Sequence, residues 1–207
     1  MNKEGFFITL EGPDKTGKST QAGFLVKHLE KLGFSVVWTR EPGGTPFAEA
    51  IRAALLNPEH KVSATAELLL YEASRAQHVG EKILPALKAG KIVVCERFTM
   101  STLAYQGYGR GMPLSEIEKL NRLASGGLKP DLTFVFDMDD SEFSRRLSKK
   151  RSDRLELEPA EFRLRVQKGY RELAKKTGAV IVDAGKPASQ VREYILAKLK
   201  PAVAHLK

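Results

Sequence analysis

The sequence predicts an α/β fold in which a five-stranded, mainly parallel sheet lies between two layers of helices. Three observations favour it. Short apolar segments rich in β-branched and aromatic residues alternate with longer segments of helical periodicity. A glycine-rich turn follows the first of these apolar segments. The 207 residues, 42% of them hydrophobic, suit one domain with a sizeable core, so we expect residues 1–207 to form a single domain.

Five segments are expected to form the strands, because each is short, apolar and bounded by Gly, Pro or charged residues. They are residues 6–12, 34–41, 91–96, 132–137 and 179–184. Helices are expected between them, where helical spacing joins Phe24, Leu25, His28, Leu29 and Leu32 after the first strand and Phe162, Val166, Tyr170 and Leu173 before the last. In such a sheet, ligands bind beyond the carboxyl ends of the strands.

One segment interrupts the alternation. Residues 145–159, RRLSKKRSDRLELEP, are basic and poor in helix signals, and they lie between two expected helices. A connection of this length without regular structure is often functional. We therefore expect a lid over the site at about residues 145–158.

The chain is strongly basic. Its 34 Lys and Arg against 25 Asp and Glu give a formal net charge of +9. This charge favours an anionic partner, and a nucleotide, a nucleic acid and an acidic membrane all remain open at this point, as does a basic surface that only keeps the protein in solution.

Cys95 is the only cysteine, which excludes an intrachain disulfide and a cysteine-built zinc site. It lies in the apolar run KIVVCERF, so we interpret it as a small core residue rather than a nucleophile, in a protein of a reducing compartment. No run approaches the roughly 18 apolar residues of a membrane span, and the first residues lack a signal-peptide pattern. The sequence therefore predicts a cytoplasmic protein.

The turn after the first strand carries the most specific motif. Residues 12–19, GPDKTGKS, match G-x-x-x-x-G-K-[ST]. Because the loop opens a helix, its backbone N–H groups and the helix N-terminus would point at a bound phosphate. Lys18 would reach the outer phosphates, and Ser19 would offer its hydroxyl to Mg²⁺. The alternation and this loop together predict the three-layer sandwich of the P-loop NTPases.

Switch GTPases, ATPases and small-molecule kinases all share such a loop. The Asn-Lys-x-Asp segment by which GTPases read guanine is absent from the sequence, which argues against that class. Instead, an acid–arginine pair, Glu96-Arg97, follows the third strand, at a strand end where α/β enzymes place their chemistry.

Six segments, in order along the chain, resemble motifs of the bacterial thymidylate kinases: EGPDKTGKST, REPGGT, LLLYEASRAQH, ERFTMSTLAYQGYGRG, GLKPDLTFVFD and RSDRLELE. They span nearly the whole chain. The resemblance implies a Mg²⁺-dependent enzyme of the nucleoside monophosphate kinase fold that transfers the γ-phosphoryl group of ATP to dTMP, giving dTDP. It also implies a homodimer, and no nucleic-acid or membrane partner.

The same resemblance implies the residues of the donor site. Those expected to bind ATP are Gly12, Pro13, Asp14, Lys15, Thr16, Gly17, Lys18, Ser19 and Thr20, and Ser19 and Glu96 are expected at the metal. The residues expected to be catalytic are Lys15, Lys18, Arg97, Arg151 and Arg154. Basic groups and a metal suit this reaction, because phosphoryl transfer asks a protein mainly to align two nucleotides and to neutralise charge.

The residues that the resemblance assigns to dTMP are Glu41, Pro42, Arg52, Tyr71, Arg75, Arg97, Ser101, Thr102, Tyr105 and Gln106. Arg52 would clamp the phosphate, Tyr71 would stack on thymine, Arg75 would bond a base carbonyl and Tyr105 would lie under the deoxyribose. The spacing of Tyr71 and Arg75 puts both on one side of a helix. The pattern alone leaves alternatives open: Tyr71 as a core residue and Arg52 as a solvated one.

Three features depart from the family pattern. Glu96 stands where the family usually has Asp, and Tyr71 stands where Phe is common. Lys15 in the loop occurs together with Arg151 and Arg154 in the lid, which combines two arrangements that family members use separately.

Two other functions stay open. Deoxynucleoside kinases also combine a phosphate loop with a Glu-Arg pair, although REPGGT and Arg52 argue against them. A nucleotide-sensing or RNA-binding module without activity would leave the acceptor residues unexplained, and no aromatic residues interleave with the basic lid.

Overall fold

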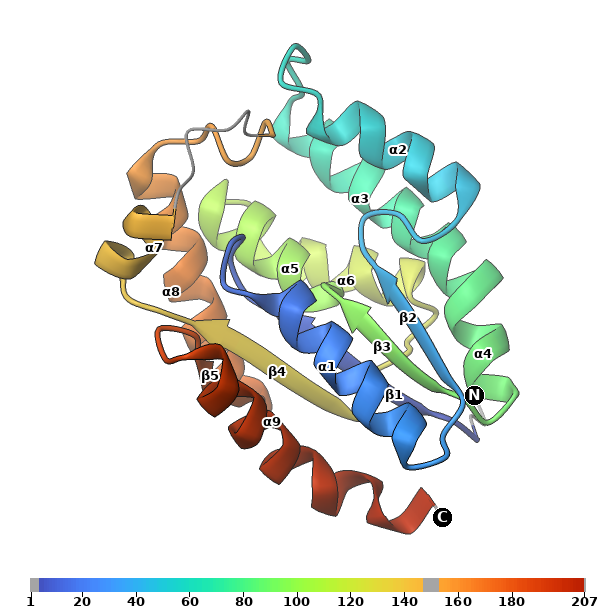
Figure 1. The fold of residues 1–207 in the computed structure, drawn as a ribbon. Coiled ribbons are helices and arrows are strands. Elements are labelled where there is room, and N and C mark those ends of the chain that lie inside the picture. Colours follow the sequence, from blue (N-terminus) through green and yellow to red (C-terminus); the bar gives the residue numbers. More distant parts are fainter. Residues whose placement is uncertain (1–3, 147–152, 207) are drawn as a thin grey trace.

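The structure is a computed structural model that describes residues 4–146 and 153–206, and it contains a sheet of five parallel strands between two layers of helices (Figure 1). The strand order is β2-β3-β1-β4-β5. The strands are β1 (Phe6–Glu11), β2 (Val36–Arg40), β3 (Ile92–Glu96), β4 (Leu132–Asp137) and β5 (Val180–Asp183). The predicted fold class is therefore confirmed, with strand ends that differ from the prediction by one or two residues.

The helices connect these strands in the order expected for parallel pairing. They are α1 (Lys18–Lys31), α2 (Pro46–Leu56), α3 (Ala64–His78), α4 (Leu84–Lys88), α5 (Thr99–Thr102), α6 (Leu114–Ala124), α7 (Asp140–Arg146), α8 (Ala160–Thr177) and α9 (Ala188–Val203). Turns of π-helix extend α3 (Val79–Ile83) and α5 (Leu103–Gly109), and a 3₁₀ turn (Ala204–Leu206) follows α9.

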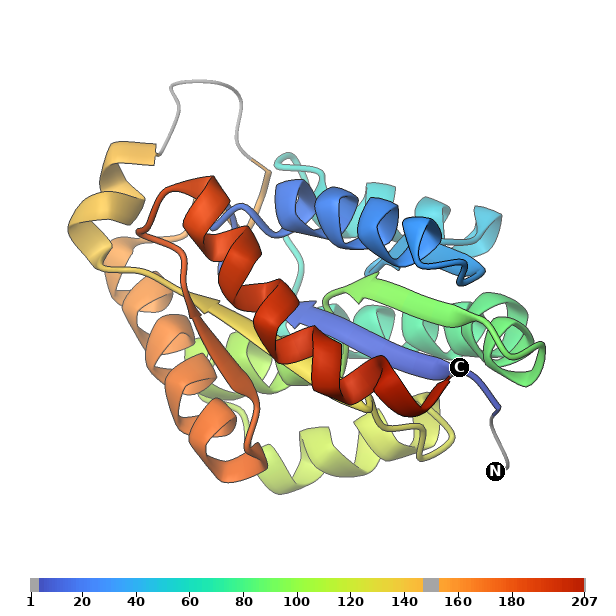
Figure 2. The same cartoon turned by 60° about the horizontal axis from the view of Figure 1, so that its bottom comes forward.

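The alternation of side chains along β1 divides the core between the two faces of the sheet. Phe6, Ile8 and Leu10 pack in one cluster with residues of α1 and α9, whereas Phe7 packs in another with residues of the π-helical turn and of α4. Figure 2 shows α1 and α9 side by side over one face. With both faces covered, the carboxyl ends of β1 and β3 are left to carry polar groups.

The predicted core positions of α8 are confirmed: Phe162, Val166, Tyr170 and Leu173 are all buried. In α1 the prediction is only partly right. Leu25 and Leu29 are buried, but Phe24 and Leu32 are exposed, because Phe24 lies outside the stripe that faces the sheet and Leu32 is the C-cap residue beyond the last turn. The guanidinium of Arg192 in α9 lies 5.0 Å from the centre of the Phe24 ring.

Cys95 lies on β3, fully buried and unpaired, as predicted for a core residue. Among the described residues, none of the helices combines the length and the apolar character that a membrane crossing requires.

Candidate active site

The phosphate-loop residues lie beyond the carboxyl end of β1 and lead into α1, as predicted, with the helix beginning at Lys18. Gly12 has a φ of 129°, and a Cβ built there would lie 2.4 Å from the Phe136 carbonyl oxygen. Gly17 has a φ of 86° and lies at the N-cap of α1. Both positions favour glycine, because their φ values are positive. At Gly12 the chain also passes too close to β4 for a side chain.

Lys18 lies inside this loop. Its ammonium donates to the Pro13 carbonyl oxygen and to the Thr16 hydroxyl, with 3.3 Å to the latter. Burial, and then the charge of Arg97, lower the pKa of Lys18 from its ordinary value of 10.5 to about 7. A phosphate entering the loop would supply the negative charge that this buried ammonium needs.

Ser19 and Glu96, the two residues expected at a metal, lie together. The Ser19 hydroxyl in the first turn of α1 donates to Glu96 Oε2 at the end of β3, with an Oγ–Oε2 distance of 2.5 Å. Within residues 4–146 and 153–206, no group of three or more His, Cys, Asp or Glu side chains is placed to hold a metal ion. Two protein oxygens fit Mg²⁺, because that ion keeps several waters and binds substrate phosphates at its other positions.

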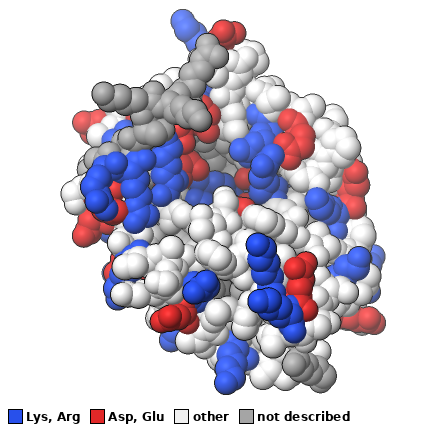
Figure 3. Space-filling model, viewed as in Figure 1, with Lys and Arg blue, Asp and Glu red and all other residues white. Residues whose placement is uncertain are grey.

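Around these groups lies an open groove of about 570 Å³, which we call the phosphate groove. It is lined by Asp14, Lys15, Gly17, Lys18, Ser19, Thr20, Trp38, Arg40, Glu41, Arg52, Glu96 and Arg97. In the space-filling view, Lys and Arg side chains flank the hollow beyond the N-terminal end of α1 (Figure 3).

A second cavity, which we call the inner pocket, adjoins the phosphate groove. It is lined by Asp14, Pro42, Arg52, Leu56, Tyr71, Arg97, Ser101, Thr102, Tyr105, Gln106, Asp153 and Leu155. Eight of the ten residues predicted to bind an acceptor are in this set. Asp14, Arg52 and Arg97 line both cavities, so a group held at the junction can be reached from either side.

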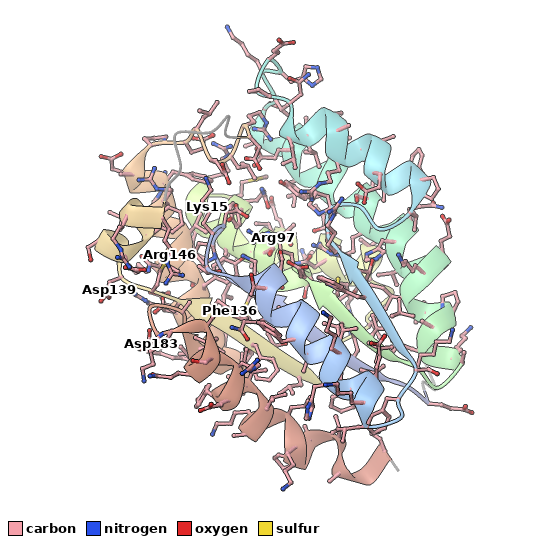
Figure 4. The ribbon with its side chains drawn as sticks, in the orientation of Figure 1. Lys15, Arg97, Phe136, Asp139, Arg146 and Asp183 are labelled. Carbon is pink, nitrogen blue, oxygen red and sulfur yellow. The ribbon has the colours of Figure 1, made fainter. Side chains whose placement is uncertain are left out.

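Arg97 is held firmly at this junction. One guanidinium nitrogen donates to the Gly12 carbonyl oxygen at 2.8 Å and to the Tyr170 hydroxyl at 3.0 Å. The other donates to Asp14 Oδ1 at 2.6 Å and to the Tyr105 hydroxyl at 3.2 Å. Figure 4 shows Lys15 of the loop and Arg97 near the end of the sheet where α1 begins.

Asp14 is the carboxylate that faces Arg97. Burial alone would raise the pKa of Asp14, but the charges of Arg97 and Lys18 outweigh it and hold the pKa well below its ordinary value. The Tyr105 hydroxyl also donates to Asp14, at 3.1 Å. The sequence prediction placed Asp14 only in the phosphate loop, whereas the structure makes it the partner that orients Arg97 and Tyr105.

Two predicted acceptor residues lie outside the inner pocket. Glu41 lines the phosphate groove, and Arg75 is not among the described residues that line either cavity, being only 2% exposed. Arg75 donates to Glu41, Glu72, Thr102, Asn121 and the Phe98 carbonyl oxygen. In this arrangement its guanidinium supports the pocket wall from behind, and its predicted contact with a base carbonyl stays a prediction.

The basic residues predicted in the loop and in the lid lie in different places. Lys15 in the loop pairs with Glu156, at 3.2 Å between Nζ and Oε2, so the loop and the segment after residue 152 are in contact. Arg154 is not among the described residues that line the phosphate groove. Its guanidinium pairs instead with Glu67 at 2.7 Å and donates to the Leu55 carbonyl oxygen at 2.8 Å. Arg151 lies outside the described residues.

Glu67 of α3 is a residue that the sequence prediction missed. Its carboxylate is 0% exposed and accepts from Gln106 at 2.8 Å, from Arg110 at 3.0 Å and from Arg154 at 2.7 Å. It therefore joins the predicted lid to Gln106 in the inner pocket. A signal was present in the sequence, because Glu67, Tyr71 and Arg75 follow one another at intervals of four on one helix face.

Glu11, the last residue of β1, is a buried carboxylate behind the site. It accepts from the Phe98 amide at 2.8 Å and from the Ser101 hydroxyl at 2.6 Å. Burial raises the pKa of Glu11 from 4.5 to about 7, although the Ser101 hydrogen bond and the charge of Arg97 oppose the rise. Folding therefore strengthens proton binding at Glu11.

We expect this carboxylate to make stability depend on pH. Between pH 4.5 and about 7 the folded protein retains a proton on Glu11 that the unfolded chain releases, so the free energy of unfolding falls as pH rises. The loss attributable to Glu11 amounts to about 3 kcal/mol at most. Denaturant unfolding at pH 5, 6, 7 and 8 should show a steeper decline for the wild type than for Glu11→Gln. Parallel curves would contradict the raised pKa.

Known proteins resemble this chain over most of its length. A family model described as thymidylate kinase matches residues 10–195. The thymidylate kinase of Halothermothrix orenii is 45% identical over 200 residues, which cover 95% of this chain and 97% of the relative. That of Pelotomaculum thermopropionicum is 49% identical over 198 residues, covering 93% and 92%. The crystal structure of the thymidylate kinase from Ehrlichia chaffeensis superposes with a TM-score of 0.78 at 35% identity, covering 95% of this chain and 98% of that one.

Proposed function

This chain belongs to the thymidylate kinase family and is an enzyme that phosphorylates dTMP, and from that premise we propose that ATP with Mg²⁺ binds in the phosphate groove and dTMP in the inner pocket. The observation that carries the proposal is the position of Arg97 and Arg52, which line both cavities. Phosphoryl transfer needs such groups at the meeting point of the two nucleotides, because the moving phosphoryl is anionic throughout.

On the donor side, Lys18 and the loop amides would bind the outer phosphates of ATP. Ser19 and Glu96 would hold Mg²⁺, which when bound neutralises phosphate charge during transfer. The lowered pKa of Lys18 supports this assignment, since a buried ammonium that donates to the neutral oxygens of Pro13 and Thr16 is prepared to pair with an anion. Lys15, which contacts Glu156, would close the loop side of the groove.

On the acceptor side, Arg52 of α2 would clamp the dTMP phosphate. Its Nη1 donates to the Pro42 carbonyl oxygen at 3.0 Å, which fixes the guanidinium and leaves other N–H groups toward the cavity. Tyr71 would stack on thymine, and Gln106, held by Glu67, would reach the base edge. Tyr105, with its hydroxyl on Asp14, would lie against the deoxyribose.

The segment around residues 153–158 would act as the lid of a single domain. Asp153 and Leu155 already line the inner pocket, and Glu156 contacts the loop through Lys15. Arg154 holds this segment to α3 through its ion pair with Glu67. Comparing kcat and dTMP affinity of Arg154→Ala with those of the wild type tests whether Arg154 also acts on the transferred phosphoryl, because that role would lower kcat.

Two further proposals concern association and location. Large apolar side chains are exposed on three helices that pack in a row: Phe47 on α2, Leu69 on α3 and Leu123, 79% exposed, on α6. A second copy of the chain would cover them, and a monomeric mass by analytical ultracentrifugation would contradict the homodimer. A cytoplasmic location would suit the buried, unpaired Cys95, and cell fractionation tests it.

We expect dTMP to be the best acceptor, dUMP a poorer one and UMP poorer still. A ribose 2′-hydroxyl pressed against the Tyr105 ring would lose its water partners, at a cost of about 1–3 kcal/mol, or roughly ten- to a hundredfold in kcat/KM. Loss of the thymine methyl costs about 1–3 kcal/mol in an apolar pocket, so dUMP should remain detectable.

The measurement is kcat/KM for dTMP, dUMP, UMP and thymidine at fixed ATP and Mg²⁺, with ADP release as the readout. Equal kcat/KM values for dUMP and UMP would show that Tyr105 does not discriminate against the ribose 2′-hydroxyl. A preference for thymidine would favour a deoxynucleoside kinase and overturn the assignment of Arg52 as a phosphate clamp.

A further inference from the structure

We propose that Trp38 is a positioning residue for the metal: its indole N–H orients the Glu96 carboxylate so that one oxygen faces Ser19 and the incoming Mg²⁺. The proposal deepens the proposed function and rests on it, because it concerns the Mg²⁺ site of the phosphate groove.

The strand register brings the two side chains together. In the parallel pairing of β2 with β3, Trp38 lies opposite Val94, and Glu96 follows Val94 by two residues. Side chains two apart on a strand share one face of the sheet. Trp38 and Glu96 are therefore diagonal neighbours on the face that α1 covers, and Ser19 lies in the first turn of that helix.

The two carboxylate oxygens of Glu96 have different partners. Trp38 Nε1 donates to Oε1 at 3.0 Å, and the Ser19 hydroxyl donates to Oε2 at 2.5 Å. The indole N–H can only donate, so it holds Oε1 without competing for a metal. With one oxygen bound by Trp38 and the other by Ser19, the plane of the carboxylate is fixed. Oε2 is left beside the hydroxyl of Ser19, which is the position that a shared cation would need.

The indole is itself held in place. A Cβ built at Gly23 in α1 would lie 3.6 Å from the ring, so the six-membered end of Trp38 rests against the helix at a position without a side chain. The residue is still 45% exposed at the edge of the phosphate groove. Packing on α1 at one end and the hydrogen bond to Glu96 at the other leave the ring little rotational freedom.

A glutamate needs such a partner more than a shorter carboxylate would, because its side chain has an additional rotatable bond. The charge of Glu96 is also available. Arg40, its direct partner in the strand register, is paired with Glu49 at 3.2 Å, and among the residues that the structure describes no Lys or Arg forms an ion pair with Glu96. Outer partners of metal ligands typically contribute about 10–100-fold in metal affinity.

The first arm of the test uses fluorescence, because Trp38 is the only tryptophan in the chain. Mg²⁺ is titrated into wild-type protein with saturating ADP, and the same mixture with EDTA gives the metal-free signal. We expect a saturable Mg²⁺-dependent change in the indole emission that is lost in Glu96→Gln. Glu118→Gln, which removes an exposed carboxylate of α6 that pairs with Lys176, should retain it. A full Mg²⁺ response in Glu96→Gln would overturn the proposal.

The second arm measures the free Mg²⁺ that gives half-maximal dTDP formation at fixed ATP and dTMP. Trp38→Phe keeps a ring against Gly23 and removes only the N–H, so we expect about a 10-fold higher Mg²⁺ requirement, an unchanged KM for dTMP and an unchanged Tm. The increase should disappear when the same substitution is made in the Glu96→Gln background, since Trp38 acts through Glu96.

Two failures are distinguishable. Wild-type protein that forms no dTDP from dTMP and ATP with Mg²⁺ would refute the proposed function. Normal wild-type activity, with an unchanged Mg²⁺ requirement in Trp38→Phe or an equal increase in both backgrounds, would refute only the role of Trp38.

Discussion

Lys18→Ala is expected to lower kcat by about 100-fold or more, because it removes a preorganised cation from the phosphoryl group that moves. In the structure the ammonium is enclosed by the loop and donates to the Pro13 carbonyl oxygen and to the Thr16 hydroxyl. No solvent reorganisation is needed to bring it to a phosphate. The measurement is kcat and both KM values at saturating Mg²⁺, on protein whose thermal unfolding has been recorded.

In contrast to kcat, the free energy of unfolding should rise in Lys18→Ala or stay unchanged. Burial lowers the pKa of Lys18 to about 7 against 10.5 in an unfolded chain, so the folded state disfavours the charged form. The unfolded chain binds more protons between pH 7 and 10.5, and stability at this group rises with pH in that window. At pH 7 or below the buried charge is a cost to folding, and Lys18→Ala relieves it.

An exposed lysine of the same helix, Lys27, provides the matched control. Lys27→Ala should leave both kcat and Tm close to those of the wild type, since surface substitutions usually change stability by no more than about 0.5 kcal/mol. Near-normal turnover in a folded Lys18→Ala protein would refute the assignment of residues 12–19 as the phosphate loop. A lower Tm with normal kinetics would make Lys18 a structural residue only.

The parts of the site that the sequence predicted are those that depend on local pattern. Short apolar segments rich in β-branched and aromatic residues located β1 and β3, and ligands of a parallel sheet bind beyond the carboxyl ends of its strands, so the loop from Gly12 and the Glu96-Arg97 pair were both expected at the site. The loop glycines reflect a backbone requirement that a short motif records directly. Helical spacing placed Tyr71 on the α3 face that meets the inner pocket.

The parts that were missed depend on which long side chain reaches which partner across the fold. The sequence cannot show that Arg154 meets Glu67, 87 positions away, rather than the phosphate loop, because both arrangements satisfy its charge. Nor can the sequence show that Glu41 and Glu72 both pair with the guanidinium of Arg75, which lies between them. The bond from Trp38 to Glu96 also joins two strands, and only the register of β2 and β3 makes it visible.

Arg97 lies where both cavities meet, and its replacement should have an effect of similar size. Arg97→Lys keeps the charge but loses the planar fork, which now reaches Gly12, Asp14 and Tyr105 at once. A lysine can neutralise one neighbour but cannot span two phosphates and still hold Asp14. We expect kcat to fall by about 100-fold or more, with much smaller changes in KM for ATP and dTMP.

This division between kcat and KM separates the possible roles of Arg97. A group that acts chiefly on the moving phosphoryl lowers kcat and leaves substrate binding nearly intact, so kcat/KM falls equally for the two substrates. A rise in the KM for dTMP at unchanged kcat would instead make Arg97 a clamp for the acceptor alone. Arg171→Lys, at an exposed arginine of α8 paired with Asp137, controls for the loss of a guanidinium as such. An Arg97→Lys enzyme that keeps its fold and at least half of the wild-type kcat would show that phosphoryl transfer does not depend on a guanidinium where the two cavities meet.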